Sequence, residues 1–231
     1  MKLSIIVPVY NEIKTIKEVL EKLSGLPVDK EIIVVDDGSK DGTREMLKNR
    51  KLEKVNGEPS IKILFHEKNQ GKGGAIQTGL KNAAGDIVCI QDADSEYDSN
   101  EIPVLLKGFD DPEVSAVFGS RFLQANPNIY KRFLLGNKFL TGLTNLIHGT
   151  KYTDTYTCYK LIKKDVFNKL GIISTGFEME AEISIKLKKL NFKVVEIPIS
   201  YRPRKLEEGK KIGWKDAVKG VLTILKYKFT N

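Results

Sequence analysis

The sequence predicts an α/β fold with a Rossmann-like, mostly parallel central sheet that is flanked by helices. Two observations carry this prediction. Apolar runs rich in β-branched residues recur along the first half of the chain, and stretches with helical spacing of apolar residues lie between them. The runs span residues 3–9, 31–35, 61–65, 86–90 and 114–118. This alternation of strand and helix is typical of a parallel sheet covered on both faces.

Two of the intervening stretches gather their apolar residues on one helical face. These residues are Ile13, Ile16, Val19, Leu20 and Leu23 in the first stretch, and Ala75, Ile76, Gly79, Leu80 and Ala83 in the second. A chain of 231 residues, 41% of them hydrophobic, is enough for one well-packed core and short for two. We therefore expect a single domain over residues 1–231.

The composition limits the classes of partner and the cellular setting. The formal net charge of +8 suits phosphate-bearing ligands or an anionic membrane, whereas no recognition motif supports nucleic-acid binding. Cys89 and Cys158 are too few for a disulfide framework, so we expect a reducing, cytoplasmic setting. The longest uncharged run, residues 139–150, is far shorter than the roughly 20 apolar residues of a membrane-spanning helix.

Polar clusters follow the first four predicted strands. They occupy residues 8–12, 36–39, 66–74 and 91–94. One such cluster alone could be a turn or a helix cap, because Asp, Asn, Ser and Gly favour those positions without any ligand. Four clusters at the carboxyl ends of parallel strands share one edge of the sheet, which is where ligands bind in such folds. The sequence therefore predicts a binding site at this edge.

The acids of the fourth cluster are candidate metal ligands. Asp92 and Asp94 lie two residues apart after a buried strand, with only the small Ala93 between them. One divalent cation could then bridge carboxylate and diphosphate oxygens, and such ligands suit Mg²⁺ or Mn²⁺ rather than zinc. Glu96 is a further candidate ligand. This cation would neutralise the charge that builds on a departing diphosphate.

The second and third clusters have their own chemistry. Asp36 and Asp37 offer acceptors for a base edge or for ribose hydroxyls, although they could instead cap the helix that we expect from Asp41 onward. Residues 71–74 combine backbone N–H groups at a helix start with the cation of Lys72, which suits a negatively charged ligand. The order of residues is not that of a Walker A loop.

Taken together, these motifs resemble those of family 2 glycosyltransferases with the GT-A fold. The first-half motifs are PVYNE at 8–12, VVDDGS at 34–39, NQGKGGA at 69–75 and QDAD at 91–94. The second half resembles the subgroup of dolichol-phosphate mannose synthases and related polyprenyl-phosphate sugar transferases. Its motifs are GSR at 119–121, DTYTCYK at 154–160, FEME at 177–180 and YRPR at 201–204.

The resemblance implies roles for individual residues. It implies a nucleotide-sugar-binding half over residues 1–95 and an acceptor-binding half over residues 96–231. The residues expected to bind the nucleotide sugar are Pro8, Tyr10, Glu12, Asp36, Asp37, Asn69, Lys72 and Asp92. The expected metal ligands are Asp92, Asp94 and Glu96, of which Glu96 departs from the Gln that is frequent in the mannose synthases. The implied reaction inverts the anomeric configuration.

The acceptor is expected to be a polyprenyl phosphate. Many relatives that glycosylate hydroxyl groups have a Glu-Asp pair whose Asp is the general base, whereas residues 177–180 here lack that Asp. A hydroxyl must lose a proton as it attacks, but a phosphate is already an anion and needs only cations to hold it in line. The candidates for this are Arg121, Lys131 and Arg132, with Arg121 and Arg132 counted among the catalytic residues beside Asp92 and Asp94.

Other assignments in the second half stay open at this point. A basic loop with Arg202, Arg204, Lys210 and Lys211 could close over the donor diphosphate. The first alternative acceptor is a hydroxyl of a glycan, glycolipid or protein, with Glu178 or Glu180 as the base. The second alternative is a non-catalytic module that binds nucleotide sugars, against which the intact Asp92 and Asp94 argue. We expect the donor to be a GDP- or UDP-sugar that carries mannose or glucose.

Two basic amphipathic segments, near 130–148 and 213–229, could bring the protein to a lipid acceptor. Helices of this kind lie in the headgroup region and are attracted to anionic lipid. The alternative is that their apolar faces pack on the core or form a dimer interface, since amphipathicity reports only a buried face. We expect peripheral contact with the cytoplasmic face of the membrane, by the protein itself or through a separate membrane-anchored partner.

Overall fold

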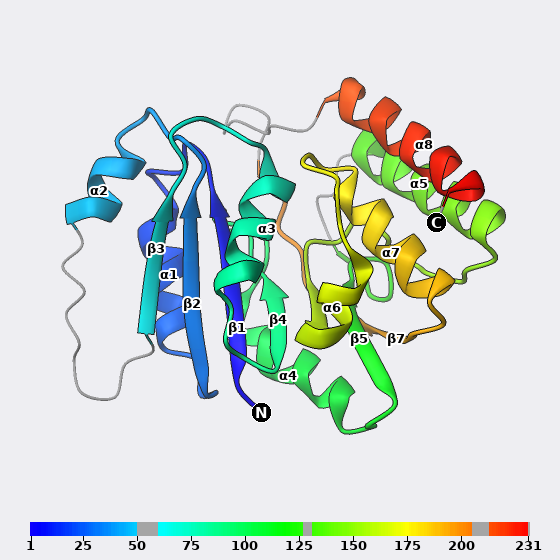
Figure 1. Cartoon of the computed structure of the whole chain (residues 1–231), viewed down its shortest axis with the longest axis horizontal. Coiled ribbons are helices and arrows are strands. Elements are labelled where there is room, and N and C mark those ends of the chain that lie inside the picture. The colour runs from blue at the N-terminus through cyan, green and yellow to red at the C-terminus, as the bar shows by residue number, and fades with distance from the viewer. Residues whose placement is uncertain (50–59, 127–130, 205–212, 231) are drawn as a thin grey trace.

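The computed structural model describes residues 1–49, 60–126, 131–204 and 213–230 (Figure 1). Its strands form one seven-stranded sheet in the order β3-β2-β1-β4-β6-β5-β7. Neighbouring strands run parallel except at β6, which is antiparallel to both β4 and β5. The predicted fold class, an α/β fold with a mostly parallel sheet, is confirmed.

Five strands coincide with the five predicted apolar runs. They are β1 (Leu3–Val9), β2 (Lys30–Asp36), β3 (Ser60–Phe65), β4 (Ile87–Ile90) and β5 (Val114–Ser120). The sequence did not predict β6 (Lys160–Lys163) or β7 (Lys193–Pro198). Lysines bound the four residues of β6, so no apolar run marks this strand. Its place between β4 and β5 is set by pairing on both sides rather than by local pattern.

Helices cover both faces of the sheet. They are α1 (Ile16–Ser24), α2 (Thr43–Asn49), α3 (Lys72–Asn82), α4 (Ile102–Leu106), α5 (Lys131–His148), α6 (Lys164–Leu170), α7 (Met179–Lys189) and α8 (Trp214–Phe229), with short 3-10 turns η1 (Ser99–Glu101) and η2 (Lys107–Phe109). In Figure 1, α3 lies in front of the sheet and α1 behind it. The predicted apolar face of α1 is buried, except that Ile13 precedes the helix and is exposed.

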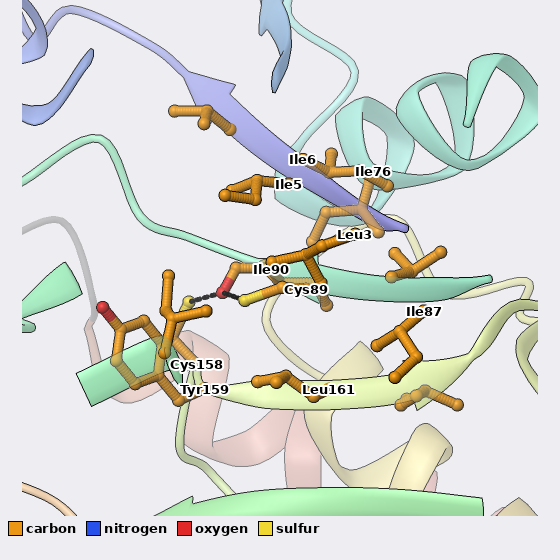
Figure 2. Close-up of a cluster of buried hydrophobic side chains, with 14 of the residues drawn as sticks. Leu3, Ile5, Ile6, Ile76, Ile87, Cys89, Ile90, Cys158, Tyr159 and Leu161 are labelled. Carbon is orange, nitrogen blue, oxygen red and sulfur yellow. Dashed lines mark hydrogen bonds between the residues drawn. The ribbon is translucent and has the colours of Figure 1, made fainter. Parts of the chain in front are cut away.

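The main core fills both sides of the central strands (Figure 2). Leu3, Ile5 and Ile6 of β1 pack with the residues of β4, and all are nearly or fully buried. The thiols of Cys89 and Cys158 both donate to the Ile90 carbonyl, at 3.7 Å. Both cysteines are buried and form no disulfide, so their role is in core packing. This dense packing at the end of β4 gives the loop of residues 91–94 a rigid base.

A second, smaller apolar cluster joins α5, α7 and α8, which lie side by side in Figure 1. Its buried members are Leu140, Ala181, Ile185, Ile224 and Tyr227. Each predicted amphipathic segment therefore forms a helix and buries one face against its neighbours, as the packing alternative required. In the described part of the chain, every helix is too short or too polar to cross a membrane.

Replacing Gly79 by alanine tests how closely α3 packs on β1. A Cβ at Gly79 would overlap the Ile6 side chain, whereas a Cβ at Gly136 of α5 would meet no atom within 4 Å. We expect Gly79→Ala to lower the free energy of unfolding by about 1–3 kcal/mol through overpacking. Gly136→Ala should instead raise it, by up to about 1 kcal/mol, because alanine favours the helix. Urea unfolding followed by circular dichroism measures both, and equal effects would contradict the packing at Gly79.

Candidate active site

A cavity of about 290 Å³ opens at the carboxyl ends of the parallel strands. All four predicted clusters contribute to its wall, together with three residues from later in the chain. Its lining includes Pro8, Val9, Tyr10, Glu12, Asp37, Asn69, Gly71, Lys72, Ala75, Asp92, Ala93, Asp94, Glu96, Phe177 and Arg204. The structure thus brings together most residues that were expected to bind a nucleotide sugar and a metal ion.

Asp37 organises the loop between β3 and α3. Its Oδ1 accepts hydrogen bonds from His66 Nδ1 at 2.7 Å and from the Gln70 N–H at 2.8 Å. Its Oδ2 accepts one from the Gly71 N–H at 2.9 Å. Gly71 has φ of 87°, in the left-handed region that favours glycine, and α3 begins at the next residue. Asp37 therefore fixes the wall of the cavity as well as offering a carboxylate to it.

Asp36 behaves differently from Asp37. It is fully buried, and its Oδ2 lies 3.6 Å from Arg44 Nη1. It does not line the cavity. The expected contact of Asp36 with a nucleotide therefore has no support in this geometry, because the side chain points into the fold and faces an arginine there.

Lys72 is the cation at the start of α3. Its Nζ lies 2.9 Å from Asp92 Oδ1 and 3.2 Å from Glu180 Oε1. Burial opposes the charged ammonium, but the negative charges around it, Asp92 first, raise the pKa of Lys72 well above its ordinary value. Burial likewise opposes ionisation of Asp92, yet the charge and hydrogen bond of Lys72, a hydrogen bond from Cys158 and the charge of Arg204 together lower the pKa of Asp92. Both groups are therefore charged at neutral pH.

Arg204 lies among three carboxylates on the other side of the cavity. Its Nη1 donates to both carboxylate oxygens of Glu12 at 3.1 Å, and its Nη2 donates to Asp94 Oδ2 at 2.7 Å. Glu96 Oε1 accepts the Arg204 backbone N–H at 2.8 Å, and Glu96 Oε2 accepts the Tyr201 hydroxyl at 2.7 Å. The segment after β7 is thus bound to the loop after β4.

The carboxylates of Asp94 and Glu96 are suitable ligands for a divalent cation. Asp94 and Glu96 both line the cavity and supply carboxylate oxygens, which Mg²⁺ and Mn²⁺ prefer. Burial, and after it the charges of Asp92 and Glu96, raise the pKa of Asp94 to about 7, although Arg204 acts in the opposite direction. Within the described ranges, no group of three or more His, Cys, Asp or Glu is arranged to hold a metal. The metal set of Asp92, Asp94 and Glu96 stays a prediction.

Arg121 has a partner that the sequence did not predict. Its guanidinium is buried and forms a bidentate pair with Asp154, with Nε 2.7 Å from Oδ2 and Nη2 2.8 Å from Oδ1. It also stands over the Tyr201 ring, 5.1 Å from the centroid, and does not line the cavity. Arg121 therefore stabilises the fold through its pair with the buried carboxylate of Asp154. Its expected contact with an acceptor phosphate stays a prediction.

The remaining expected cations are only partly described. Lys131 and Arg132 begin α5, and their side chains lie outside the described structure, as do residues 205–212 with Lys210 and Lys211. Arg202 is exposed, and its backbone N–H donates to the Glu96 carbonyl at 2.9 Å. Their expected contacts with donor or acceptor stay predictions.

Glu178 and Glu180 do not line the cavity, although Phe177 beside them does. Glu178 Oε1 accepts the Gly176 N–H at 3.1 Å. Glu180 is buried between Lys72 and Lys160. The part that Lys160 plays was not visible in the sequence, because a lone lysine at a strand start gives no sign of its distant partner.

The fold is that of glycosyltransferases of the GT-A class. The model of glycosyl transferase family 2 matches residues 4–171, and the chain belongs to that family.

Two curated relatives are similar along most of the chain. One is a dolichol-phosphate mannosyltransferase of Pyrococcus furiosus, 28% identical, whose match covers 91% of this chain and 59% of the relative. The other is an undecaprenyl-phosphate mannosyltransferase of Micrococcus luteus, 26% identical, with 92% of this chain and 88% of the relative covered. This chain therefore spans well under two thirds of the length of the Pyrococcus relative.

Among solved structures, glucosyl-3-phosphoglycerate synthase from Mycobacterium tuberculosis is similar in fold. The TM-score is 0.70 at 18% identity, and the match covers 100% of this chain and 79% of the synthase. That structure holds Mn²⁺, uridine diphosphate and phosphoglyceric acid. At this identity the likeness establishes the fold alone.

Truncating Arg121 tests its structural role. We expect Arg121→Ala to lower the free energy of unfolding by about 3–5 kcal/mol, because Asp154 is left buried and unpaired. The control is Lys169→Ala, which removes an exposed partner of Asp165 at 3.5 Å and should change stability by less than about 0.5 kcal/mol. Denaturant unfolding measures both variants. Unchanged stability of Arg121→Ala would contradict this structural role.

Proposed function

We propose that this chain is an inverting glycosyltransferase that moves mannose or glucose from a GDP- or UDP-sugar to a polyprenyl phosphate at the cytoplasmic membrane face. Family membership supports the reaction class, and the two mannosyltransferase relatives support the sugar and the acceptor. The observation that carries the proposal is the cavity itself, where Lys72 and Arg204 lie beside Asp92, Asp94 and Glu96. Charges of both signs at one edge suit a diphosphate together with a divalent cation.

Different residues of the cavity bind different parts of the sugar donor. Pro8, Tyr10 and Asp37 form the wall nearest β1 and β2, where a nucleoside is expected to lie. Lys72 offers its ammonium to a diphosphate oxygen, and a phosphate or diphosphate is also favoured by the N–H groups at the start of α3. A divalent cation held by Asp94 and Glu96, with Asp92 beside them, would supply charge neutralisation for the departing nucleoside diphosphate.

The surroundings of Glu180 favour a phosphate acceptor over a hydroxyl acceptor. A general base must be within hydrogen-bond reach of the proton that it takes. Glu180 instead has both oxygens against lysines and does not line the cavity. A phosphate acceptor is an anion at neutral pH and attacks without such a base, so the arrangement supports transfer to a polyprenyl phosphate.

Helices α5 and α8 also present apolar residues to solvent, on the sides that do not face the small cluster with α7. These residues, which we call the α5–α8 apolar surface, are Leu135, Phe139, Leu146, Val218, Leu222, Leu225 and Phe229, with exposures from 43% to 87%. Exposed lysines, including Lys138, Lys215, Lys219 and Lys226, lie on the same helices. Apolar side chains flanked by lysines fit the interface of an anionic membrane, which is where a polyprenyl phosphate resides.

Transfer into organic solvent tests the reaction. Purified protein with Mn²⁺ or Mg²⁺, a polyprenyl phosphate and labelled GDP-mannose, GDP-glucose or UDP-glucose should give a lipid-soluble product. Chelation by EDTA should abolish this product, and Asp94→Asn should lower turnover by at least about 100-fold, the scale expected when an electrostatic contact to the transition state is lost. The matched control is Asp165→Asn on α6, an exposed acid remote from the cavity.

Other outcomes of the same assay favour the alternatives. Transfer only to water-soluble hydroxyl acceptors would overturn the lipid assignment. Nucleotide binding without any transfer would favour the non-catalytic module. Turnover by Asp94→Asn at the wild-type rate, or turnover that survives EDTA, would remove the metal from the proposal.

Vesicle sedimentation tests the α5–α8 apolar surface. We expect the protein to bind vesicles that contain anionic phospholipid and to bind neutral vesicles less well. Leu222→Glu should weaken this binding by about 10-fold or more, because burial of one such side chain contributes about 1.5–3 kcal/mol. Val104→Glu is the control, since Val104 of α4 is 50% exposed and lies on another helix. A concentration-dependent dimer that Leu222→Glu dissociates would instead identify the surface as a dimer interface.

A further inference from the structure

Four charged side chains of alternating sign run inward from the cavity. Asp92 Oδ1 lies 2.9 Å from Lys72 Nζ, which lies 3.2 Å from Glu180 Oε1. Glu180 Oε2 lies 2.6 Å from Lys160 Nζ. We call these four residues the buried charge chain. Only its first two members, Asp92 and Lys72, line the cavity.

Glu180 and Lys160, the inner half of the buried charge chain, are held in the core. Lys160 opens β6 and is fully buried, and its ammonium donates to the carbonyls of Thr155 at 3.0 Å and Thr157 at 2.6 Å. It also stands over the Phe118 ring, 5.0 Å from the centroid. Glu180 lies in the first turn of α7 and is 2% exposed. The Glu180 carboxylate is therefore held from behind and directed toward Lys72.

Packing alone does not call for such an arrangement. Burying a charge costs several kcal/mol even when it is paired, and apolar residues of similar size commonly serve stability as well. A single partner, Asp92, would already neutralise Lys72. A second carboxylate on another side of the ammonium restricts a long side chain that otherwise samples many rotamers. Glu180 thus orients the Lys72 ammonium, whose charge Asp92 already compensates.

We propose that Glu180 is a positioning residue for donor binding, which holds the Lys72 ammonium at the cavity wall while Lys160 neutralises Glu180 from the core side. This inference rests on the proposed use of a nucleoside diphosphate sugar. Glu180 Oε1 lies 3.2 Å from the Lys72 ammonium and accepts no hydrogen bond, so it holds Lys72 by charge alone. The N–H donors of Lys72 that Asp92 does not engage serve a diphosphate oxygen of the donor. Glu180, which is engaged by two lysines, has no part as a general base.

Charge-balanced variants separate positioning from stability. Glu180→Gln keeps the shape of the side chain but leaves one uncompensated buried positive charge, and Lys160→Met leaves one negative charge. The double variant Lys160→Met with Glu180→Gln restores neutrality, with the Lys72 and Asp92 pair intact. We expect each single variant to lower Tm and the double variant to recover most of that loss.

Binding of GDP and UDP, measured by calorimetry with Mn²⁺ present, gives the decisive readout. We expect Glu180→Gln and the double variant to bind the preferred nucleotide at least about 10-fold more weakly, since a factor of ten corresponds to one well-made charged contact. Lys160→Met keeps Glu180 beside Lys72 and should bind within about threefold of wild type. The double variant keeps the test valid if Glu180→Gln alone does not fold.

Three results would overturn the inference. Recovery of both Tm and nucleotide affinity in the double variant would make Glu180 merely structural. Unchanged affinity with a large loss of turnover in Glu180→Gln would return it to the role of base. Wild-type protein that binds neither GDP nor UDP would overturn the donor assignment proposed above, and this inference with it.

Discussion

Strand β1 pairs in parallel with β2 on one side and with β4 on the other, and this pairing sets the position of the site. The register places Val9 beside Asp36, and the Asp37 N–H continues the ladder by donating to the Val9 carbonyl at 2.8 Å. On the other side the Gln91 N–H donates to the Ile6 carbonyl at 3.0 Å. The two acidic loops therefore emerge together, and a cavity between them is a consequence of the sheet.

The acidic side chains that follow the strands are balanced by two cations, Lys72 and Arg204. Burial, and after it the charges of Asp92 and Glu96 in the loop after β4, raise the pKa of Asp94 to about 7. Lys72 of α3 pairs with Asp92 and with Glu180 of α7. Arg204, in the segment after β7, pairs with Glu12 and Asp94. A site built in this way holds anionic and cationic groups in reach of one another, as transfer from a nucleoside diphosphate requires.

Helix α7 links the site to the surface that we assign to the membrane. Its first turn carries Glu180, which lies behind the cavity and 3.2 Å from Lys72 in the cavity wall. Ala181 and Ile185 of the same helix pack in the small cluster with α5 and α8. The outward sides of α5 and α8 carry the α5–α8 apolar surface. The cavity and the α5–α8 apolar surface are thus connected through helices that pack side by side (Figure 1).

Local sequence pattern was enough to predict five strands, the buried face of α1 and the clusters that line the cavity, because each depends on that pattern and on the common edge of a parallel sheet. The fold was needed to reveal β6, the burial of Asp36 and the partners of Arg121, Glu180 and Arg204. The sequence does not distinguish a charged residue that binds a ligand from one that pairs with a buried acid. The partner lies 33 residues away for Arg121 and 110 for the Arg204 bond to Asp94, so only the fold sets the difference.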